Sequence, residues 1–373
     1  HAARRPWAMF GKPLPAWLAS DPRAEARLRL ALSALAFLIG ATIAAVRTRY
    51  GAADFDVFWA AARHPFTPYD PRVIAELKAM MHIEGEWPFV YPPTFLLFAW
   101  PFGLMPLGLA YPLWAGLGMA LFVLASSFMV RPVWANALLF LTPCVVFAVA
   151  PGQSTPFVGA AAIAAFNVVE RRPWLAGALF AVAACLKPQA MVLAPVVLWG
   201  RWRTLAGAVA AGLALMAASC VFGADLWLQW PRTLVAFRDV MPTVSRVNPS
   251  ALIASPVWAL ALALFGLALA WRSKDLFGLV AGGLCLTPYA HDYDLAPLAP
   301  VAITWIAERR RLGWGHAALG GAFLAGLVRS PLATTLFLAG AAILKTPWLA
   351  GAMKKGAPVA RSPFPNSSPE AEA

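Results

Sequence analysis

The stretch LRLALSALAFLIGATIAAV, residues 28–46, is the first of a series of long apolar runs in this chain. Its length falls within the range of about 17–25 residues that a helix needs to cross a bilayer. Similar runs recur as far as residue 346. The sequence therefore predicts an all-α polytopic membrane protein.

The composition supports this class. Of 373 residues, 61% are hydrophobic and 13% are charged, and the mean hydropathy is +0.67. A soluble domain carries roughly 25% charged residues, so a soluble enzyme is excluded. The seventeen Trp suit the two membrane interfaces. The pI near 10.2 is better explained by basic cytoplasmic loops than by a nucleic-acid partner, and we expect none.

Twelve membrane spans are predicted. They lie near 28–46, 109–130, 133–150, 155–169, 174–187, 189–200, 204–222, 251–271, 275–289, 293–307, 313–328 and 331–346. The further apolar run 91–101 has prolines near both ends, so we expect an interfacial or re-entrant helix there. If it were counted as a span, the later basic loops would lie on the opposite side of the membrane from the basic N-terminus.

Charge then orients the chain. With twelve spans, one side holds twenty of the thirty Lys and Arg and seven of the seventeen Asp and Glu. The other side holds ten basic and ten acidic residues. Because cytoplasmic loops are rich in Lys and Arg, both termini are predicted to be cytoplasmic. The polar motifs in loops 47–108, 151–154, 187–189, 223–250 and 289–294 then all lie on the outer face.

The first of these motifs is Ala53-Asp54-Phe55-Asp56-Val57-Phe58-Trp59, which follows the first span. Carboxylates near a helix N-terminus often act only as caps. A carboxylate at a membrane surface can also act as a general base for an acceptor hydroxyl. Residues i and i+2 point in directions about 200° apart, so Asp54 and Asp56 are expected to have different roles.

Two further polar positions interrupt the apolar pattern. Lys187 lies between two apolar runs and precedes Pro188. A lysine at membrane depth is costly, so it either extends to the outer surface or binds a phosphate. The Gly152-Gln153 pair is either an ordinary turn between two spans or a turn whose Gln153 side chain hydrogen-bonds a sugar hydroxyl.

Later in the chain, His291, Asp292 and Asp294 cluster within four positions. This spacing is a weak signal for a metal, and we expect none. Loop 223–250 supplies tryptophans that stack on sugars or anchor at lipid headgroups. It also supplies arginines that hold phosphate, Arg232, Arg238 and Arg246. The four cysteines lie in apolar runs without metal-ligand spacing, so neither a zinc site nor a disulfide framework is expected.

The ordered set of motifs resembles glycosyltransferase family 87, in the GT-C superfamily of membrane enzymes that use polyprenyl-phosphate sugars. The resemblance covers roughly residues 50–300. Its segments are Asp54–Ala62, Pro68-Tyr69-Asp70, Phe89–Pro93, Gly152-Gln153, Ala184–Gln189, Thr287-Pro288-Tyr289 and His291–Leu295. One departure is that Pro151 precedes the Gly-Gln turn, near which the family often has an Asn.

The resemblance implies a GT-C-like bundle, whose first outer loop carries interfacial helices, and an inverting transfer of a hexose, typically mannose, to a hydroxyl acceptor. It also implies that Asp54 is the catalytic base. We expect Lys187, Arg232 and Arg238 to bind the donor phosphate, so that no divalent metal or other cofactor is needed. Expected substrate-binding residues are Asp56, Tyr91, Gln153, Gln189, His291, Asp292 and Asp294.

The resulting hypothesis is one transmembrane catalytic domain, 1–354, with a disordered cytoplasmic tail, 355–373. The enzyme would lie in the plasma (inner) membrane and act on its outer face, with a polyprenyl-phosphate sugar, membrane lipids and an envelope glycolipid or glycan acceptor as partners. A transporter or flippase of lipid-linked sugars is the main alternative. It would need ionisable groups near the bilayer midplane and symmetric halves, and no internal repeat is evident. A scaffold of envelope assembly and a transferase of a lipid-linked pentose are further alternatives.

Overall fold

The protein is described by a computed structural model, which covers residues 22–48, 53–73, 75, 88–244, 256–287, 291–307, 314–328, 330 and 333–342. All regular secondary structure within these ranges is helical. The predicted tail 355–373 lies outside them.

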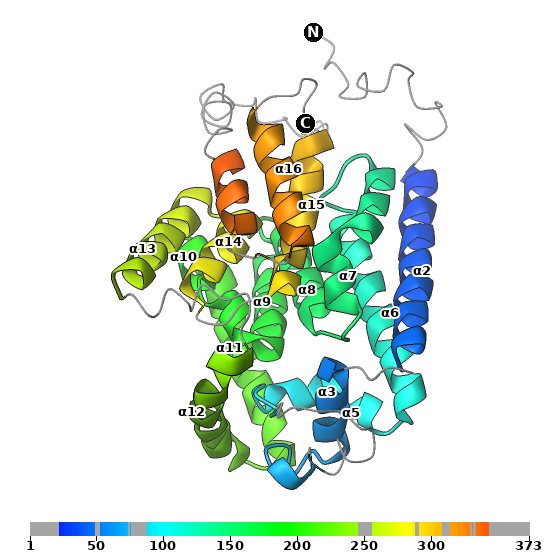
Figure 1. The fold of residues 1–373 in the computed structure, drawn as a ribbon, viewed down its shortest axis with the longest axis vertical. Coiled ribbons are helices and arrows are strands. Elements are labelled where there is room, and N and C mark those ends of the chain that lie inside the picture. The colour runs from blue at the N-terminus through cyan, green and yellow to red at the C-terminus, as the bar shows by residue number, and fades with distance from the viewer. Residues whose placement is uncertain are drawn as a thin grey trace, which may run out of the picture.

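The chain begins with α2 (Pro22–Arg47), the short α3 (Ala53–Arg63) and α5 (Thr94–Gly103), and then α6 (Leu107–Ser126). Figure 1 shows the helices that follow, gathered into one bundle. They are η3 (Val133–Leu141), α7 (Pro143–Val149), α8 (Thr155–Val168), α9 (Pro173–Leu186), η4 (Pro188–Met191), α10 (Ala194–Val197), α11 (Trp202–Ser219), η5 (Cys220–Phe222), α12 (Leu226–Val244), α13 (Pro256–Ser273), α14 (Leu276–Leu286), η7 (Asp292–Leu298), α15 (Ala299–Ala307), α16 (Trp314–Leu327) and a last helix over 333–342.

Where the structure describes them, the predicted spans coincide with helical segments, but the number of twelve is not confirmed. In the described part of the chain, three helices are long and apolar enough to cross a membrane: Pro22–Arg47, Leu107–Ser126 and Trp202–Phe222. Several predicted spans are shorter or broken. Residues 133–150 form η3 and α7, 189–200 form parts of η4 and α10, and 293–307 form parts of η7 and α15. Prolines at or near each break remove backbone donors and interrupt the helix.

The run at 91–101 contributes to α5, which has 10 residues. At about 1.5 Å per residue it is too short to cross a bilayer by itself. It packs against α3 instead, and both lie at the lower end of Figure 1.

Three of the basic loops lie at the opposite end of the bundle from Thr155 and Lys187. Arg201 donates to Glu170 Oε1 at 2.9 and 3.1 Å and to the carbonyl of Lys274 at 3.4 Å, so three loops meet at one end. Helix α8 begins at Thr155, and Glu170 lies just beyond its other end. Lys187 follows the last residue of the neighbouring α9. Thr155 and Lys187 therefore share the other end.

Small residues allow α2 and α6 to pack closely along each other. A methyl group added to Gly40 would lie 2.7 Å from the carbonyl oxygen of Ala115 and 3.1 Å from Cβ of Met119. Such close approach of backbones is common where membrane helices associate through van der Waals packing. This contact holds α2 against α6.

Gly40→Ala is predicted to destabilise the protein, because the added methyl group collides with backbone that cannot rotate away. The expected cost is about 1–3 kcal/mol, seen as a lower unfolding temperature in detergent. The control is Gly212→Ala in α11, where nothing lies within 4 Å of the added group. Equal unfolding temperatures for the two variants would show that the α2–α6 contact can accommodate the added methyl group.

Candidate active site

Helix α3 brings Asp54 to the site through a fixed first turn. The backbone N–H of Phe55 donates to the carbonyl of Pro151 at 3.0 Å, and the rings of Phe55 and Phe58 are buried. Asp54 is partly buried and contributes to the wall of a cavity. Asp56 is buried and is not among the residues that line this cavity, in keeping with the divergence of i and i+2 on a helix.

The turn that carries Gln153 is held against α3 and α6. Tyr111 donates to the carbonyl of Ala150, and Trp114 Nε1 donates to the carbonyl of Gly152 at 2.9 Å. Gly152 has φ of +75°, and an added Cβ would lie 2.6 Å from Cβ of Phe55. Only glycine fits this conformation and this space.

Gln153 links two other elements of the site. Its side chain is buried, and its Oε1 accepts a hydrogen bond of 3.4 Å from the hydroxyl of Tyr91. Asp54 lines the same cavity, and the Gln153 amide favours its ionised form and so acts to lower its pKa. Since a carboxylate only accepts, Nε2 is the end of the amide that can serve Asp54.

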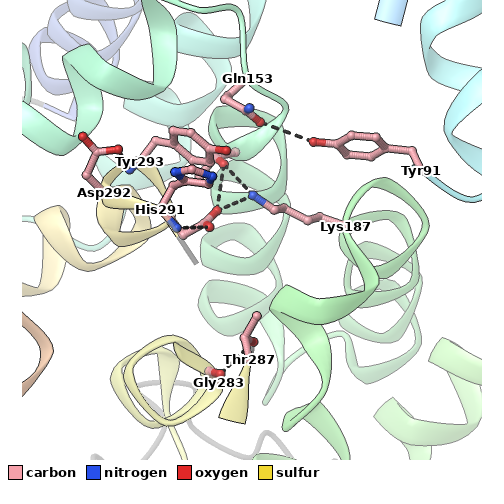
Figure 2. Close-up of polar contacts among 10 residues, drawn as sticks. Tyr91, Gln153, Lys187, Gly283, Thr287, His291, Asp292 and Tyr293 are labelled. Atoms are coloured by element: carbon pink, nitrogen blue, oxygen red, sulfur yellow. Dashed lines mark hydrogen bonds and ion pairs between the residues drawn. The ribbon is translucent and has the colours of Figure 1, made fainter. Parts of the chain in front are cut away.

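Lys187 is the buried cation of the site. It follows the last residue of α9, and its side chain is 3% exposed. Its ammonium forms an ion pair with Asp294, donates to Thr155 Oγ1 at 3.5 Å and lies 4.9 Å from the centre of the Tyr293 ring. Figure 2 shows Lys187 reaching from α9 into this group. The partners explain how the charge is tolerated away from water.

Asp294 is itself held in place. One carboxylate oxygen accepts from Lys187 and from Thr155 Oγ1, the latter at 3.4 Å, and the other accepts from the backbone N–H of His291 at 3.0 Å. Figure 2 shows these contacts as one connected network. The network fixes Lys187 relative to η7.

A cavity of about 330 Å³ joins these groups. Its polar lining includes Asp54, Lys187 and Gln153. The α12 side chains Trp230, Leu234 and Phe237 contribute to its apolar wall. The other lining residues are Val57, Phe58, Pro88, Val90, Tyr91, Pro92, Pro188, Gln189, Thr287 and Tyr293. The cavity thus places a carboxylate and an ammonium against one largely apolar space.

The sequence model of the family described as glycosyltransferase family 87 matches residues 89–333, which is more than half of the chain. The chain belongs to this family. The protein is thus a glycosyltransferase, and its apolar helices fit a membrane protein. Comparison with curated proteins and with solved structures gives no match.

The family match and the geometry support different parts of the glycosyltransferase site. Tyr91, Gln153, Lys187 and Asp294 lie within the matched residues. The match begins after Asp54, so it does not bear on that residue. The placement of Asp54 in the same cavity wall as Lys187 comes from the structure alone.

Burial in the cavity wall raises the pKa of Asp54 from 3.8 to about 6. The hydrogen bond from Gln153 and the charge of Lys187 act in the opposite direction, whereas Asp294 and Asp292 raise the pKa further. A glycosyltransferase base with a pKa near the working pH is both deprotonated and able to accept a proton efficiently.

His291 and Asp292 lie beside the cavity without lining it. His291 caps η7 and stacks on Tyr293, with 4.8 Å between ring centres. Asp292 is buried and accepts from the backbone N–H of Tyr293 at 3.0 Å. In Figure 2 it points away from Lys187.

The arginines of loop 223–250 are separated from the cavity or outside the described residues. Arg232 is exposed on α12, whereas the cavity-lining residues of α12 are Trp230, Leu234 and Phe237. The predictions for the side chain of Arg238 and for Arg246 lie outside the described residues. Trp230 Nε1 donates to the carbonyl of Val90 at 3.0 Å, which fixes α12 beside the cavity.

Sequence reasoning missed several cavity residues. Thr287 and Tyr293 lie within the motifs that carry the family resemblance, so that pattern could have identified them. Leu234 and Phe237 gave no such signal, because apolar residues in an amphipathic helix look alike whether they face a cavity, the protein core or lipid. Within the described residues, no group of three His, Cys, Asp or Glu side chains is arranged to hold a metal.

Asp294→Asn is predicted to destabilise the glycosyltransferase by about 3 kcal/mol, because it leaves the buried Lys187 ammonium without its counter-ion. The measurement is the unfolding temperature in detergent at pH 7. The double variant Lys187→Met/Asp294→Asn is expected to recover part of the loss, because the unpaired charge is gone.

The matched control is Asp70→Asn, which removes an ion pair with Arg72 at the protein surface. We expect no measurable shift of the unfolding temperature there. If Asp294→Asn and Asp70→Asn shift the unfolding temperature equally, the Lys187–Asp294 ion pair does not hold the site together.

Proposed function

We propose that the protein transfers a hexose, most simply mannose, from a polyprenyl-phosphate donor to a hydroxyl group of an envelope glycolipid or glycan, with inversion. The observation that carries the proposal is that Asp54 and Lys187, from segments far apart in the sequence, line one cavity. An acceptor hydroxyl needs a base, and a departing phosphate needs a cation. The largely apolar wall suits a lipid-linked substrate.

In the proposed reaction, the acceptor oxygen attacks the anomeric carbon from the face opposite the phosphate. Its proton passes to the carboxylate of Asp54 as the new carbon–oxygen bond forms. The bond between the anomeric carbon and the phosphate oxygen breaks, and its electron pair stays on that oxygen. The leaving group is then a phosphomonoester with one more negative charge than the donor.

Lys187 is proposed to stabilise that added charge. An ammonium has three N–H donors, and among the described residues Asp294 and Thr155 accept two of them. The third is proposed to bind a phosphate oxygen. Because the ammonium is already fixed by its partners, little reorganisation is needed in the transition state. A divalent metal is then not required, and we propose none.

Binding of the substrate is proposed to involve the remaining polar groups around the cavity. Gln189 lines it and can donate hydrogen bonds to sugar or phosphate oxygens, and the hydroxyl oxygen of Tyr91, whose proton is donated to Gln153, can accept one from a sugar hydroxyl. Arg232 and Arg238 of α12 are proposed to attract the phosphate as the donor approaches. His291, Asp292 and Asp56 are proposed to act from behind the cavity wall, by supporting the residues that line it.

We propose a GT-C-like bundle of twelve spans over residues 1–354, with cytoplasmic termini and the site on the outer face of the plasma membrane. Support comes from the separation of the basic loops, joined through Arg201, from the end that carries Lys187. Basic loops favour the cytoplasm. A cytoplasmic tail over 355–373 is part of the proposal.

The transporter alternative has less support. Membership of a glycosyltransferase family favours transfer over transport. The charged groups of the site, Asp54, Lys187 and Asp294, gather at one end of the helices. Transfer from a lipid-linked pentose would use the same chemistry, and the assay below distinguishes it from transfer of mannose.

Asp54→Asn is predicted to reduce transfer by at least about 100-fold, the lower end of the usual contribution of a general base. The assay is transfer by purified protein in detergent from radiolabelled polyprenyl-phosphate mannose to extracted membrane glycolipids. Binding of the donor should persist, since Lys187 is unchanged. Near-normal turnover of this variant would remove Asp54 from the mechanism.

The same assay tests the function itself. Transfer from the mannosyl donor supports the proposal in full, and transfer from a lipid-linked pentose alone supports the chemistry with a different donor. Absence of transfer from every lipid-linked sugar, by protein that still unfolds cooperatively, would contradict the proposed function.

The rate should also depend on pH in a defined direction. Because Asp54 must be deprotonated to act as a base and its pKa is raised to about 6, kcat/KM should fall about tenfold per unit below pH 6. It should be constant over the first unit or two above that value. If kcat/KM instead begins to fall only near pH 4, the general base is a carboxylate in a more solvated environment than that of Asp54.

A further inference from the structure

We propose that Gln153, held by the Tyr91 hydroxyl, is a positioning residue that fixes the carboxylate of Asp54 through one amide N–H, rather than a sugar-binding residue. This inference rests on the proposed function of Asp54 as the base. It assigns a use to the Gly152-Gln153 turn that sequence reasoning left between an ordinary turn and a sugar contact.

The backbone that carries Gln153 has little freedom. Three different residues hold the preceding segment: Phe55 bonds Pro151, Tyr111 bonds Ala150, and Trp114 bonds Gly152. The Gln153 N–H also donates to the carbonyl of Ala148 at 3.0 Å. One of the holding groups, the Phe55 N–H, belongs to the residue that follows Asp54. The turn and the base are therefore fixed to each other directly.

The amide of Gln153 also has a defined orientation. Its Oε1 accepts from the hydroxyl of Tyr91, which leaves its Nε2 available to Asp54 in the wall of the same cavity. The ring of Tyr91 is itself packed against Phe58 and Phe95, with ring centres 4.8 and 4.5 Å away. The phenol thus selects one of the two amide orientations, the one in which a donor faces the base.

This arrangement has two consequences for the base. The Gln153 bond occupies one lone pair of the carboxylate, which directs the remaining lone pairs toward the cavity and the acceptor hydroxyl. It also favours the ionised form, which offsets part of the burial that raises the Asp54 pKa. Removing the donor should therefore affect both the orientation of the base and the pH at which it works.

Other groups around Asp54 also affect its pKa. Lys187 at the end of α9 favours the ionised form, and Asp292 and Asp294 of η7 oppose it. Tyr111 of α6 is stacked on Phe55, with 5.2 Å between the ring centres. None of these groups is altered by substitution of Gln153, so a change in pH dependence can be assigned to the lost amide bond.

The test compares the pH profiles of kcat/KM for wild type, Gln153→Leu and Tyr91→Phe, with radiolabelled polyprenyl-phosphate mannose as donor. For Gln153→Leu we expect the acid limb to move up by about 0.5–1 pH unit and kcat to fall more than KM rises. Tyr91→Phe keeps the ring packing and frees the amide to rotate, so it should shift the limb in the same direction by less. Gln189→Leu, which removes another amide from the cavity wall, should leave the limb in place.

If Gln153→Leu and Tyr91→Phe raise KM and leave the acid limb unmoved, Gln153 binds substrate and the proposal is overturned. A second readout separates this failure from failure of the proposed function. The infrared C=O band of protonated Asp54, identified as the band lost in Asp54→Asn, is titrated in each variant without substrate. A higher midpoint in Gln153→Leu supports the pairing even if no sugar is transferred, and an unchanged midpoint contradicts it even if transfer is robust.

Discussion

The ion pair between Lys187 and Asp294 is the interaction on which the arrangement of the site depends. A lysine buried at the end of a helix is tolerated only if its charge is compensated, and the compensation comes from η7, more than a hundred residues further along the chain. Through this pair, α9 and η7 are fixed at the same end of the bundle, with Thr155 of α8 between them. The ammonium proposed to stabilise the departing phosphate is thereby held in position before any substrate arrives.

The part of the cavity wall that carries Asp54 is held by a different kind of constraint. Asp54 is positioned by aromatic packing and by hydrogen bonds that the Phe55 N–H of α3 and the Trp114 indole of α6 donate to carbonyls of the turn before Gln153. The proposed base and the proposed phosphate-binding cation thus belong to separately fixed parts of the structure, and both line the cavity. This separation suits a displacement in which the nucleophile enters and the phosphate leaves on opposite sides of one carbon. It also explains why one carboxylate, Asp54, has a raised pKa while another, Asp294, serves as a counter-ion.

Much of this could be predicted from the sequence, and the remainder has physical reasons. The apolar runs predicted an all-helical membrane protein, and the order of the motifs predicted family 87. The lengths of the spans could not be read reliably, because Pro143, Pro188 and Pro297 lie within or beside apolar runs that look continuous by composition. The pairing of Lys187 with Asp294 was hidden because nothing local links them. The different directions of Asp292 and Asp294 follow from the roughly three residues per turn of η7, which put Asp294 and His291 on one side.

The central claim is that Asp54 and Lys187 act on opposite sides of one bound donor. The most direct measurement is a cryo-electron microscopy structure of the inactive Asp54→Asn variant with polyprenyl-phosphate mannose. The account predicts a phosphate oxygen within hydrogen-bonding distance of Lys187 Nζ, with the anomeric carbon facing residue 54 across the cavity. A donor whose phosphate lies away from Lys187, or whose sugar lies outside the cavity, would contradict it.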